Sequence, residues 1–329
     1  MKKRLISTLV ITCMIALTGA FAANSAQHEP VFQEWGGAGP GSFTFAAMAA
    51  IGEAVNATSD FLSVNVQTTV GSLAHYHMFE QGFLHAGSGA GTTDIEAWTG
   101  GTTNFPQPIQ SFRSILVFTR TFQTIIVRAD SGIYTVADLE GRTIAVGAAG
   151  APAAAIAAGT LSALGVNANF VYTTSAEMVD LYIDGRVDVF MLTSAGGNAN
   201  VINVMNSVNS RLINLTDEEI QTVLEGELRG RITATQLTND IYDFIPEDAP
   251  LNVLMEITVL NVVDTTEDHV VREILDIYWS QHADLFAVLR GLNGLPEDIL
   301  RVSAYIHPEA ARFYEEVFNI YIPADRVLP

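Results

Sequence analysis

Two residue types are nearly missing from this sequence, cysteine and lysine. The single cysteine is Cys13, and the two lysines are Lys2 and Lys3. All three stand in a short N-terminal segment, so the rest of the chain has no thiol, no disulfide and no amine side chain. Burial of a core must therefore hold the fold together. The same absences exclude a cysteine nucleophile and a phosphate-binding loop of the Walker type, which needs a lysine.

Basic charge is scarce along the whole chain. Beyond residue 22, thirteen arginines stand against thirty-six aspartates and glutamates, a formal charge of −23. Such an excess of negative charge repels the phosphates of nucleic acids and of anionic membranes. Neither nucleic acid nor an anionic membrane surface is therefore an expected partner.

Long apolar runs are scarce as well. The run over residues 5–17 follows three basic residues and is shorter than the ~20 residues that span a bilayer. Ala20 and Ala22 then place small residues at the two positions that a signal peptidase reads. These features predict a signal peptide over residues 1–22, cleavage near Ala22, and export to the periplasm without stable membrane insertion. The alternative is a retained N-terminal anchor.

Strand-like and helix-like segments alternate along the remaining chain. This alternation predicts an α/β fold with parallel sheets of doubly wound type. Two such blocks and two long strand segments predict two lobes with a two-strand hinge: lobe 1 over residues 30–123 and 258–329, and lobe 2 over residues 124–257. The expected strands are 31–35, 61–68, 82–88, 115–119, 123–128, 142–146, 169–172, 187–192, 211–215 and 253–263; the expected helices include 42–54, 72–80, 94–98, 151–164, 175–183, 199–208 and 217–225.

Glycine-rich or small-residue segments follow four of the expected strands, at residues 36–41, 87–91, 147–150 and 193–198. Three of them are rich in glycine and precede a helix, where free backbone N–H groups suit a carboxylate or a phosphate. In doubly wound folds such loops meet in one crevice at the carboxyl ends of the strands. We favour this interpretation over four unrelated tight turns. Phe43, directly after the first loop region, is the aromatic residue most expected to face a ligand.

Motifs for catalysis or for metal binding are absent. No segment fits Gly-x-Gly-x-x-Gly, and no Gly-x-Ser-x-Gly elbow stands between a strand and a helix. His75 and His77 are two residues apart on an expected helix, so their rings do not converge on a metal, and we expect them on the helix surface. We therefore predict no catalytic residues, no metal and no cofactor.

Four segments together resemble a known family. Residues 135–147 are similar to a segment common in periplasmic binding proteins of the second structural type, 184–190 to their "dGxiDaff" turn, and 307–314 to a C-terminal helix of theirs. With residues 36–43, the set resembles the TAXI family of TRAP transporter solute receptors. The resemblance implies the two-lobed type II periplasmic binding protein fold, a small-molecule solute such as an organic carboxylate or amino acid, TRAP membrane subunits as partners, and no catalysis.

The resemblance also implies where the ligand binds. The implied ligand-binding residues lie in five loops: Gly37, Ser42, Phe43, Ser72, Leu73, Ala90, Gly91, Thr92, Gly150, Ala151, Pro152, Ala153, Thr193, Ser194 and Asn198. The family often has hydroxyls where residues 147–153 read Gly-Ala-Ala-Gly-Ala-Pro-Ala. Each missing hydroxyl removes a hydrogen bond of about 1 kcal/mol. The expected solute is therefore a glutamate-like acid or a less polar organic acid.

Two other classes of function remain open from the sequence. An exported enzyme, such as a hydrolase, can use the same scaffold, since a fold does not dictate a function. A binding protein of this kind can also report to a sensor kinase instead of serving a permease.

Overall fold

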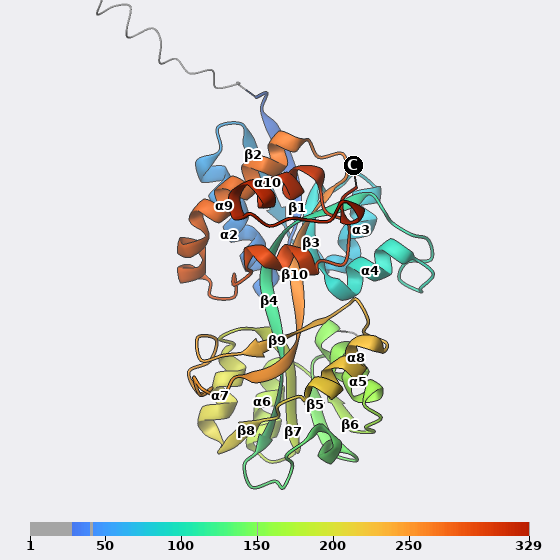
Figure 1. The fold of residues 1–329 in the computed structure, drawn as a ribbon, viewed down its shortest axis with the longest axis vertical. Coiled ribbons are helices and arrows are strands. Elements are labelled where there is room, and N and C mark those ends of the chain that lie inside the picture. Colours follow the sequence, from blue (N-terminus) through green and yellow to red (C-terminus); the bar gives the residue numbers. More distant parts are fainter. Residues whose placement is uncertain (1–27, 40–41, 150, 329) are drawn as a thin grey trace, which may run out of the picture.

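The computed structural model describes residues 28–39, 42–149 and 151–328. The predicted signal peptide lies outside these residues, as does Gly150. The described chain forms two lobes, one above the other in Figure 1, joined by β4 (Phe112–Arg128) and β10 (Leu251–Val263). The predicted two-lobed α/β fold is thus confirmed. Among the described residues, no helix has both the length and the apolar composition needed to cross a membrane.

Lobe 1, at the top of Figure 1, holds the first and the last segments of the described chain. In it, α2 packs against α9 and α9 packs against α10, whereas α3 packs against β3 and α4. Its elements, besides the upper parts of β4 and β10, are β1 (Val31–Gly36), α2 (Phe43–Thr58), β2 (Leu62–Gln67), α3 (Ser72–Glu80), β3 (Ala86–Ala90), α4 (Gly91–Thr99), α9 (Asp268–Val288) and α10 (Pro308–Phe318), with short 3-10 helices at Pro296–Arg301 and Ala324–Arg326.

Lobe 2 holds the middle of the chain. Here α5 packs against α8 on one side of the sheet, and α6 packs against α7 on the other (Figure 1). Its elements, besides the lower parts of β4 and β10, are β5 (Thr143–Val146), α5 (Pro152–Ala163), β6 (Asn169–Tyr172), α6 (Ser175–Ile183), β7 (Val189–Ala195), α7 (Ala199–Ser207), β8 (Ser210–Leu212), α8 (Asp217–Glu225) and β9 (Thr233–Leu237), with a 3-10 helix at Val136–Leu139.

The strands of both lobes belong to one hydrogen-bonded sheet. Its main path within the described residues is β2-β1-β3-β10-β4-β7-β5-β6, with β8 beside β4 and β9 beside β10. In lobe 1, β1 is parallel to β2 and β3, and in lobe 2, β5 is parallel to β6 and β7. β10 runs antiparallel to both β3 and β4, and β4 runs antiparallel to β7. The two doubly wound blocks are therefore joined by the strands they share.

The two long strands form the predicted connection between the lobes. β4 is continuous from Phe112 to Arg128, so the expectation of two strands at 115–119 and 123–128 is wrong. The polar Thr119-Arg120-Thr121 segment interrupts the apolar pattern, but the backbone hydrogen bonds to β10 continue through it. Both predicted lobe boundaries, after residues 123 and 257, fall inside these strands, and the division itself stays a prediction.

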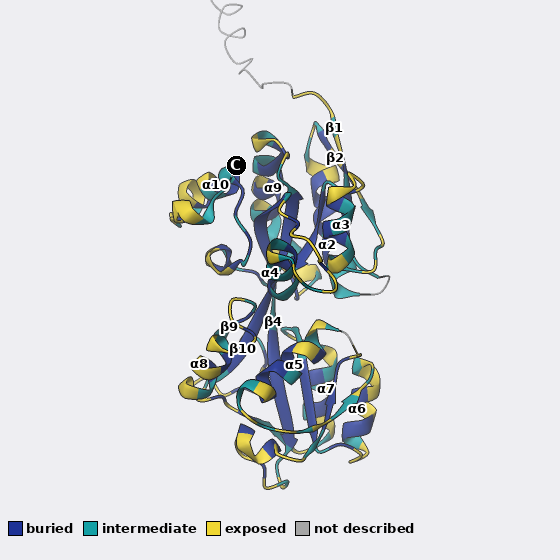
Figure 2. Cartoon of the chain, turned by 90° about the vertical axis from the view of Figure 1, so that its right-hand side faces the viewer, coloured by how far each residue is buried: buried dark blue, intermediate teal, exposed yellow. Residues whose placement is uncertain are grey.

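Local sequence explains where several helices begin. The Ser42 hydroxyl accepts a hydrogen bond from the Phe45 N–H at 3.1 Å and caps α2. Thr216 and Glu219 form a capping box at the start of α8. Such caps satisfy backbone donors that a helix leaves free in its first turn. Figure 2 shows the result: the strands are buried in the centre of each lobe, and the helices expose only their outer faces.

Close packing explains the composition of β3. This strand reads Ala-Gly-Ser-Gly-Ala, although glycine is a poor strand residue. A Cβ at Gly87 would lie 3.0 Å from the His75 ring, and a Cβ at Gly89 would meet Asn261, Asp94 and, at 2.8 Å, the Tyr76 hydroxyl. The strand therefore lacks side chains where α3 and β10 approach it. The expected strand at 82–88 therefore begins and ends too early, since the strand is Ala86–Ala90.

Candidate functional site

A cavity of about 410 Å³ opens between the two lobes, beside the strands that join them. Lobe 1 contributes the first turn of α2 and the loop after α9, and lobe 2 contributes the segment that follows β7. The crossing strands form the floor. The lining residues are Phe43, Thr44, Thr119, Thr121, Ser194, Ala195, Gly196, Gly197, Asn198, Thr258, Leu289, Arg290 and Gly291.

The floor of the cavity carries hydroxyl groups. Thr119 on β4 lies opposite Thr258 on β10 in the antiparallel pair. Thr119 is 1% exposed, and within the described chain its Oγ1 has no hydrogen-bond partner. Thr121 Oγ1 donates to the backbone oxygen of Glu256 at 3.0 Å. A buried hydroxyl without a partner is costly, so a group that enters the cavity and bonds to Thr119 gains free energy.

The loop after α9 forms one wall, and hydrogen bonds fix it to β4. The Gly294 N–H donates to the Phe118 oxygen at 3.2 Å, and the Arg120 N–H donates to Asn293 Oδ1 at 2.8 Å. Gly291 is buried against the Phe43 ring so closely that a Cβ there would overlap the ring. The loop and the first turn of α2 therefore form a single wall that holds Arg290 at the cavity.

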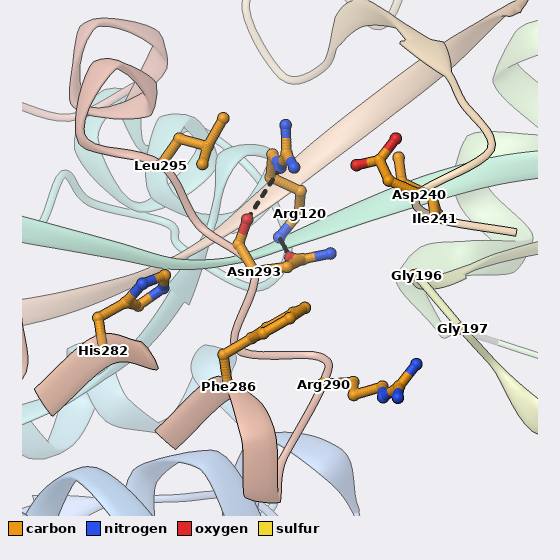
Figure 3. A pocket seen from close by; sticks show the side chains of 10 residues that line it. All are labelled: Arg120, Gly196, Gly197, Asp240, Ile241, His282, Phe286, Arg290, Asn293 and Leu295. Atoms are coloured by element: carbon orange, nitrogen blue, oxygen red, sulfur yellow. Dashed lines mark hydrogen bonds between the residues drawn. The ribbon is translucent and has the colours of Figure 1, made fainter. Parts of the chain in front are cut away.

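A second cavity of about 240 Å³ adjoins the first and shares Gly196, Gly197 and Arg290 with it (Figure 3). Arg120, which also lines it, donates from Nε to the Asn293 oxygen at 3.0 Å and lies 3.8 Å from Asp298 Oδ2. Asp240 lines this cavity from lobe 2, and Figure 3 shows its carboxylate on the same side of the cavity as Arg120. Arg290 thus lines both cavities. The larger cavity is rich in hydroxyl groups, and the smaller one is rich in charged groups.

Two helices begin at the first cavity. α2 begins at Phe43, and α7 begins just after Asn198, whose Oδ1 accepts from the Asn200 N–H at 2.9 Å. The aligned peptide dipoles of each helix give its N-terminus a partial positive charge. Side chains already accept hydrogen bonds from some of these N–H groups. The main contribution of the two helices to anion binding is therefore the electrostatic field of their N-termini, and not free N–H donors.

The structure brings some of the predicted ligand-binding residues together. Phe43, Ser194 and Asn198 line the larger cavity. Ser42 caps the helix that begins with Phe43, and Thr193 precedes Ser194 on β7, with its Oγ1 buried and, among the described residues, without a partner. These five positions lie in one place, as the crevice interpretation expects.

The other predicted residues lie outside the lining of this cavity. Several make contacts within the protein instead: Thr92 Oγ1 donates to Glu256 Oε1 at 2.7 Å, Gly91 packs against the backbone of Arg231, and Ser72 Oγ lies 3.2 Å from Thr93 Oγ1. Their part in binding stays a prediction. The residues in this group are Gly37, Ser72, Leu73, Ala90, Gly91, Thr92, Ala151, Pro152 and Ala153.

Sequence reasoning missed the hydroxyls of the crossing strands and the loop after α9. One signal was present: Thr119, Arg120 and Thr121 interrupt an apolar strand that is buried on both faces. Polar residues at the centre of such a strand need partners, which a ligand can supply. Arg290 carried no such signal, since an arginine in a loop is usually just solvated.

The expectation that His75 lies on the surface of its helix is wrong. Its ring is fully buried, 2.8 Å from the Ser88 oxygen through Nδ1 and 2.6 Å from Thr69 Oγ1 through Nε2. Burial lowers the pKa of His75 from 6.5 to about 4, so the ring is neutral at pH 7. Among the described residues, no group of three or more His, Cys, Asp or Glu side chains is arranged to hold a metal ion.

This burial makes a prediction about acid stability. Because the folded pKa of His75 lies below the unfolded one, the unfolded chain takes up the proton first, and stability is lost as pH falls through the window from 6.5 to about 4. The full shift corresponds to about 3 kcal/mol. Urea unfolding of wild type and His75→Gln at pH 7.5 and pH 4.5 measures it: the free-energy advantage of wild type should shrink at the lower pH. An unchanged advantage would contradict the assignment.

Two buried carboxyls lie at β10: Glu256 belongs to this strand, and Asp94 contacts Asn261 on it. Asp94 is fully buried and accepts hydrogen bonds from the Tyr76 hydroxyl and, at 3.2 Å, from Asn261 Nδ2. Burial raises the pKa of Asp94 to about 7. Burial also raises the pKa of Glu256, whose Oε1 is held by Thr92. One oxygen of each carboxyl thus accepts hydrogen bonds from neighbouring side chains.

Solved structures resemble the chain at low sequence identity. MatC from Rhodopseudomonas palustris with bound malate is 14% identical, covers 87% of this chain and 96% of its own, and superposes with a TM-score of 0.52. The periplasmic aliphatic sulphonate binding protein SsuA from Escherichia coli is 12% identical, with 87% and 79% covered and a TM-score of 0.47. The probable amino-acid ABC transporter extracellular-binding protein ytmK from Bacillus subtilis is 10% identical, with 80% and 96% covered and a TM-score of 0.48.

Sequence comparison places the chain more definitely. No curated protein matches it in sequence. The NMT1-like family, by contrast, matches residues 35–317, which include most of both lobes, both crossing strands and every residue that lines the larger cavity. The chain therefore belongs to the NMT1-like family.

Proposed function

We propose that the chain is the extracytoplasmic solute receptor of a TRAP transporter of the TAXI type. In this proposal it binds a small carboxylate between its lobes, closes on it, and delivers it to the membrane subunits without catalysis. The observation that carries the proposal is the cavity of about 410 Å³ lined by both lobes and by the two strands that join them. MatC, which shares the fold, is described with bound malate, and this favours an organic acid as solute.

Closure follows from the position of the cavity. Ser194 and Asn198 approach from lobe 2, whereas Phe43 and Thr44 approach from lobe 1. Bending of β4 and β10 brings these two walls together and removes the solute from water, which strengthens every hydrogen bond to it. The closed surface is then the form that the membrane subunits recognise.

Identification of the solute tests this function. Mass spectrometry of the protein purified without refolding should detect an organic acid released on denaturation. A thermal-shift panel of carboxylates should then raise Tm by about 5 °C at a hundredfold excess over Kd, since binding of that strength adds about 2.7 kcal/mol. Small-angle scattering should report a smaller radius of gyration with the solute bound.

The alternatives predict other results. An enzyme would convert the acid, so the solute recovered after hours with the protein would differ from the one added. A receptor returns it unchanged. If no acid of the panel shifts Tm while an uncharged solute does, the carboxylate part of the proposal is overturned.

A further inference from the structure

The charge on the walls of the larger cavity is unusual for this chain. The sequence has 36 acidic and 16 basic residues, yet the cavity is lined by one basic side chain, Arg290, and, among the described residues, by no carboxylate. A cavity with this lining attracts anions in a protein that otherwise repels them. The positive charge of Arg290 at the cavity is therefore a local feature, opposite in sign to the net charge of the whole chain.

Arg290 is held in place by its backbone, while its guanidinium is free. The Leu292 N–H donates to the Leu289 oxygen at 2.8 Å, which makes a turn around Arg290, and Asn293 anchors the end of the turn to β4. Within the part of the chain that the structure describes, the Arg290 side chain makes no ion pair or hydrogen bond. Arg120, by contrast, is engaged by Asn293 and Asp298. A fixed backbone with a free planar donor suits bidentate binding of a carboxylate.

The cavity offers no charge to an ammonium group. On β10, Glu256 stands two residues before Thr258, which lines the cavity. Its carboxyl is only 7% exposed, and it accepts hydrogen bonds from Thr92 Oγ1 at 2.7 Å and from the Thr92 N–H at 3.4 Å. Asp240 lines the neighbouring cavity and not the larger one (Figure 3). An ammonium in the larger cavity would therefore lose its water without gaining an anionic partner.

The hydroxyls complete the recognition. The unpartnered Thr119 Oγ1 is buried on the floor, and Thr121, Thr258 and Ser194 stand around it. Neutral hydroxyls can donate to a keto oxygen, and can donate to or accept from an alcohol. They also accept from an ammonium, but they do not offset its charge.

We propose that the cavity selects an organic acid that carries a hydroxyl or keto group and no ammonium group, and that Arg290 binds its carboxylate. This inference rests on the proposed receptor function and narrows its solute. It also distinguishes the chain from an amino acid receptor. A receptor of that kind needs an Asp or Glu side chain to pair with the ammonium group, whereas this cavity offers neutral hydroxyls to the substituent at the 2-position of the acid.

Matched pairs of acids test the selection directly. Titration calorimetry on the full exported chain compares malate with aspartate, 2-oxoglutarate with glutamate, and lactate with alanine, so that each pair differs at one group. In at least one pair we expect the hydroxy or keto acid to bind about 30-fold more tightly, the range set by an unpaired charged group. Equal binding within every pair that binds, or tighter binding of the amino acid, overturns the inference while leaving a receptor function intact.

Variants test the role of Arg290. For the acid that binds wild type, Arg290→Gln should raise Kd about 30-fold, and Arg290→Lys should recover part of the loss. Arg229→Gln is the control for loss of one positive charge. Arg229 is exposed, follows α8 and lines neither cavity, so its replacement should change Kd less than twofold. Equal effects of Arg290→Gln and Arg229→Gln would show that net charge, and not the site, attracts the acid. If no acid binds while an uncharged solute does, the inference is overturned and the receptor function stands; if no solute of either kind binds, the receptor function itself is overturned.

Discussion

Replacing Asn261 by leucine is expected to lower the free energy of unfolding by about 3–5 kcal/mol, because it removes one of two side-chain donors to the buried Asp94 carboxyl and the acceptor of the buried Ser114 hydroxyl. Asn261 is fully buried on β10. Its Nδ2 donates to Asp94 Oδ1 at 3.2 Å, and its Oδ1 accepts from Ser114 Oγ at 2.7 Å. Leucine is similar in size but satisfies neither group. The loss is therefore one of hydrogen bonds, and packing changes little.

The loss should grow with pH. The folded pKa of Asp94, about 7, lies above its ordinary value of 3.8, so the folded chain holds the proton longer and wild type loses stability as pH rises through that window. Removal of the Asn261 donor raises the folded pKa further and extends this loss above pH 7. Urea unfolding followed by circular dichroism at pH 5 and pH 8 should thus show a larger deficit at pH 8.

A matched substitution separates this effect from asparagine loss in general. Asn65 lies exposed on β2, where its Nδ2 donates to Glu34 Oε2 at 2.7 Å. Asn65→Leu should cost less than about 1 kcal/mol, since exposed polar contacts contribute little. A deficit of Asn261→Leu below 1 kcal/mol, or one that is the same at both pH values, would contradict the assigned cluster.

Replacing Gly291 by alanine is expected to weaken solute binding about 100-fold while costing only about 1–3 kcal/mol of stability, the usual range for overpacking. The new Cβ would overlap the Phe43 ring, which stands at the first residue of α2 and lines the cavity. Either the ring moves into the cavity or the loop that holds Arg290 moves away from it. Both displacements damage the site more than the core. Titration calorimetry with the tightest acid of the panel measures the change.

Gly39 supplies the control, because a Cβ there meets nothing within 4 Å. Gly39→Ala should leave both affinity and stability close to wild type. The double variant Phe43→Leu with Gly291→Ala should recover part of the affinity, because a smaller side chain leaves room for the Cβ, and such a pair couples in a double-mutant cycle. If Gly291→Ala lowers stability and leaves affinity unchanged, this wall is not part of the binding site.

Much of the architecture could be predicted from local patterns. The helix expected at 72–80 has those bounds in the structure, and the helix expected to begin at residue 42 begins at Phe43, with Ser42 as its N-cap. Hydrophobic periodicity and capping residues act within a few positions of the chain, which is why they can be read from it. β9 was not predicted, because Thr233–Leu237 is short and mostly polar. It forms a strand because it pairs with β10, which extends beside it.

The candidate site could be predicted only in part. Phe43, Ser194 and Asn198 were predicted and line the cavity, since the carboxyl ends of strands meet at one edge of a doubly wound sheet. Thr119, Thr258 and Arg290 were not found, because their place depends on contacts between distant segments. His75 is a further example. Its helix was predicted, but its burial was not, because the ring packs against glycines of β1 and β3 that are distant in sequence.

By itself the sequence determined an acidic chain, without cysteine beyond Cys13 and with alternating strands and helices, and these properties follow from composition and from local periodicity. The tertiary structure decided which polar groups share a cavity. The pairing of β4 with β10, with shifts of register after Thr258 and after Leu260, sets which threonines share the floor, and the return of the chain after α9 places Arg290 beside them. Both depend on hydrogen bonds between residues more than a hundred positions apart, whose energies no local pattern records.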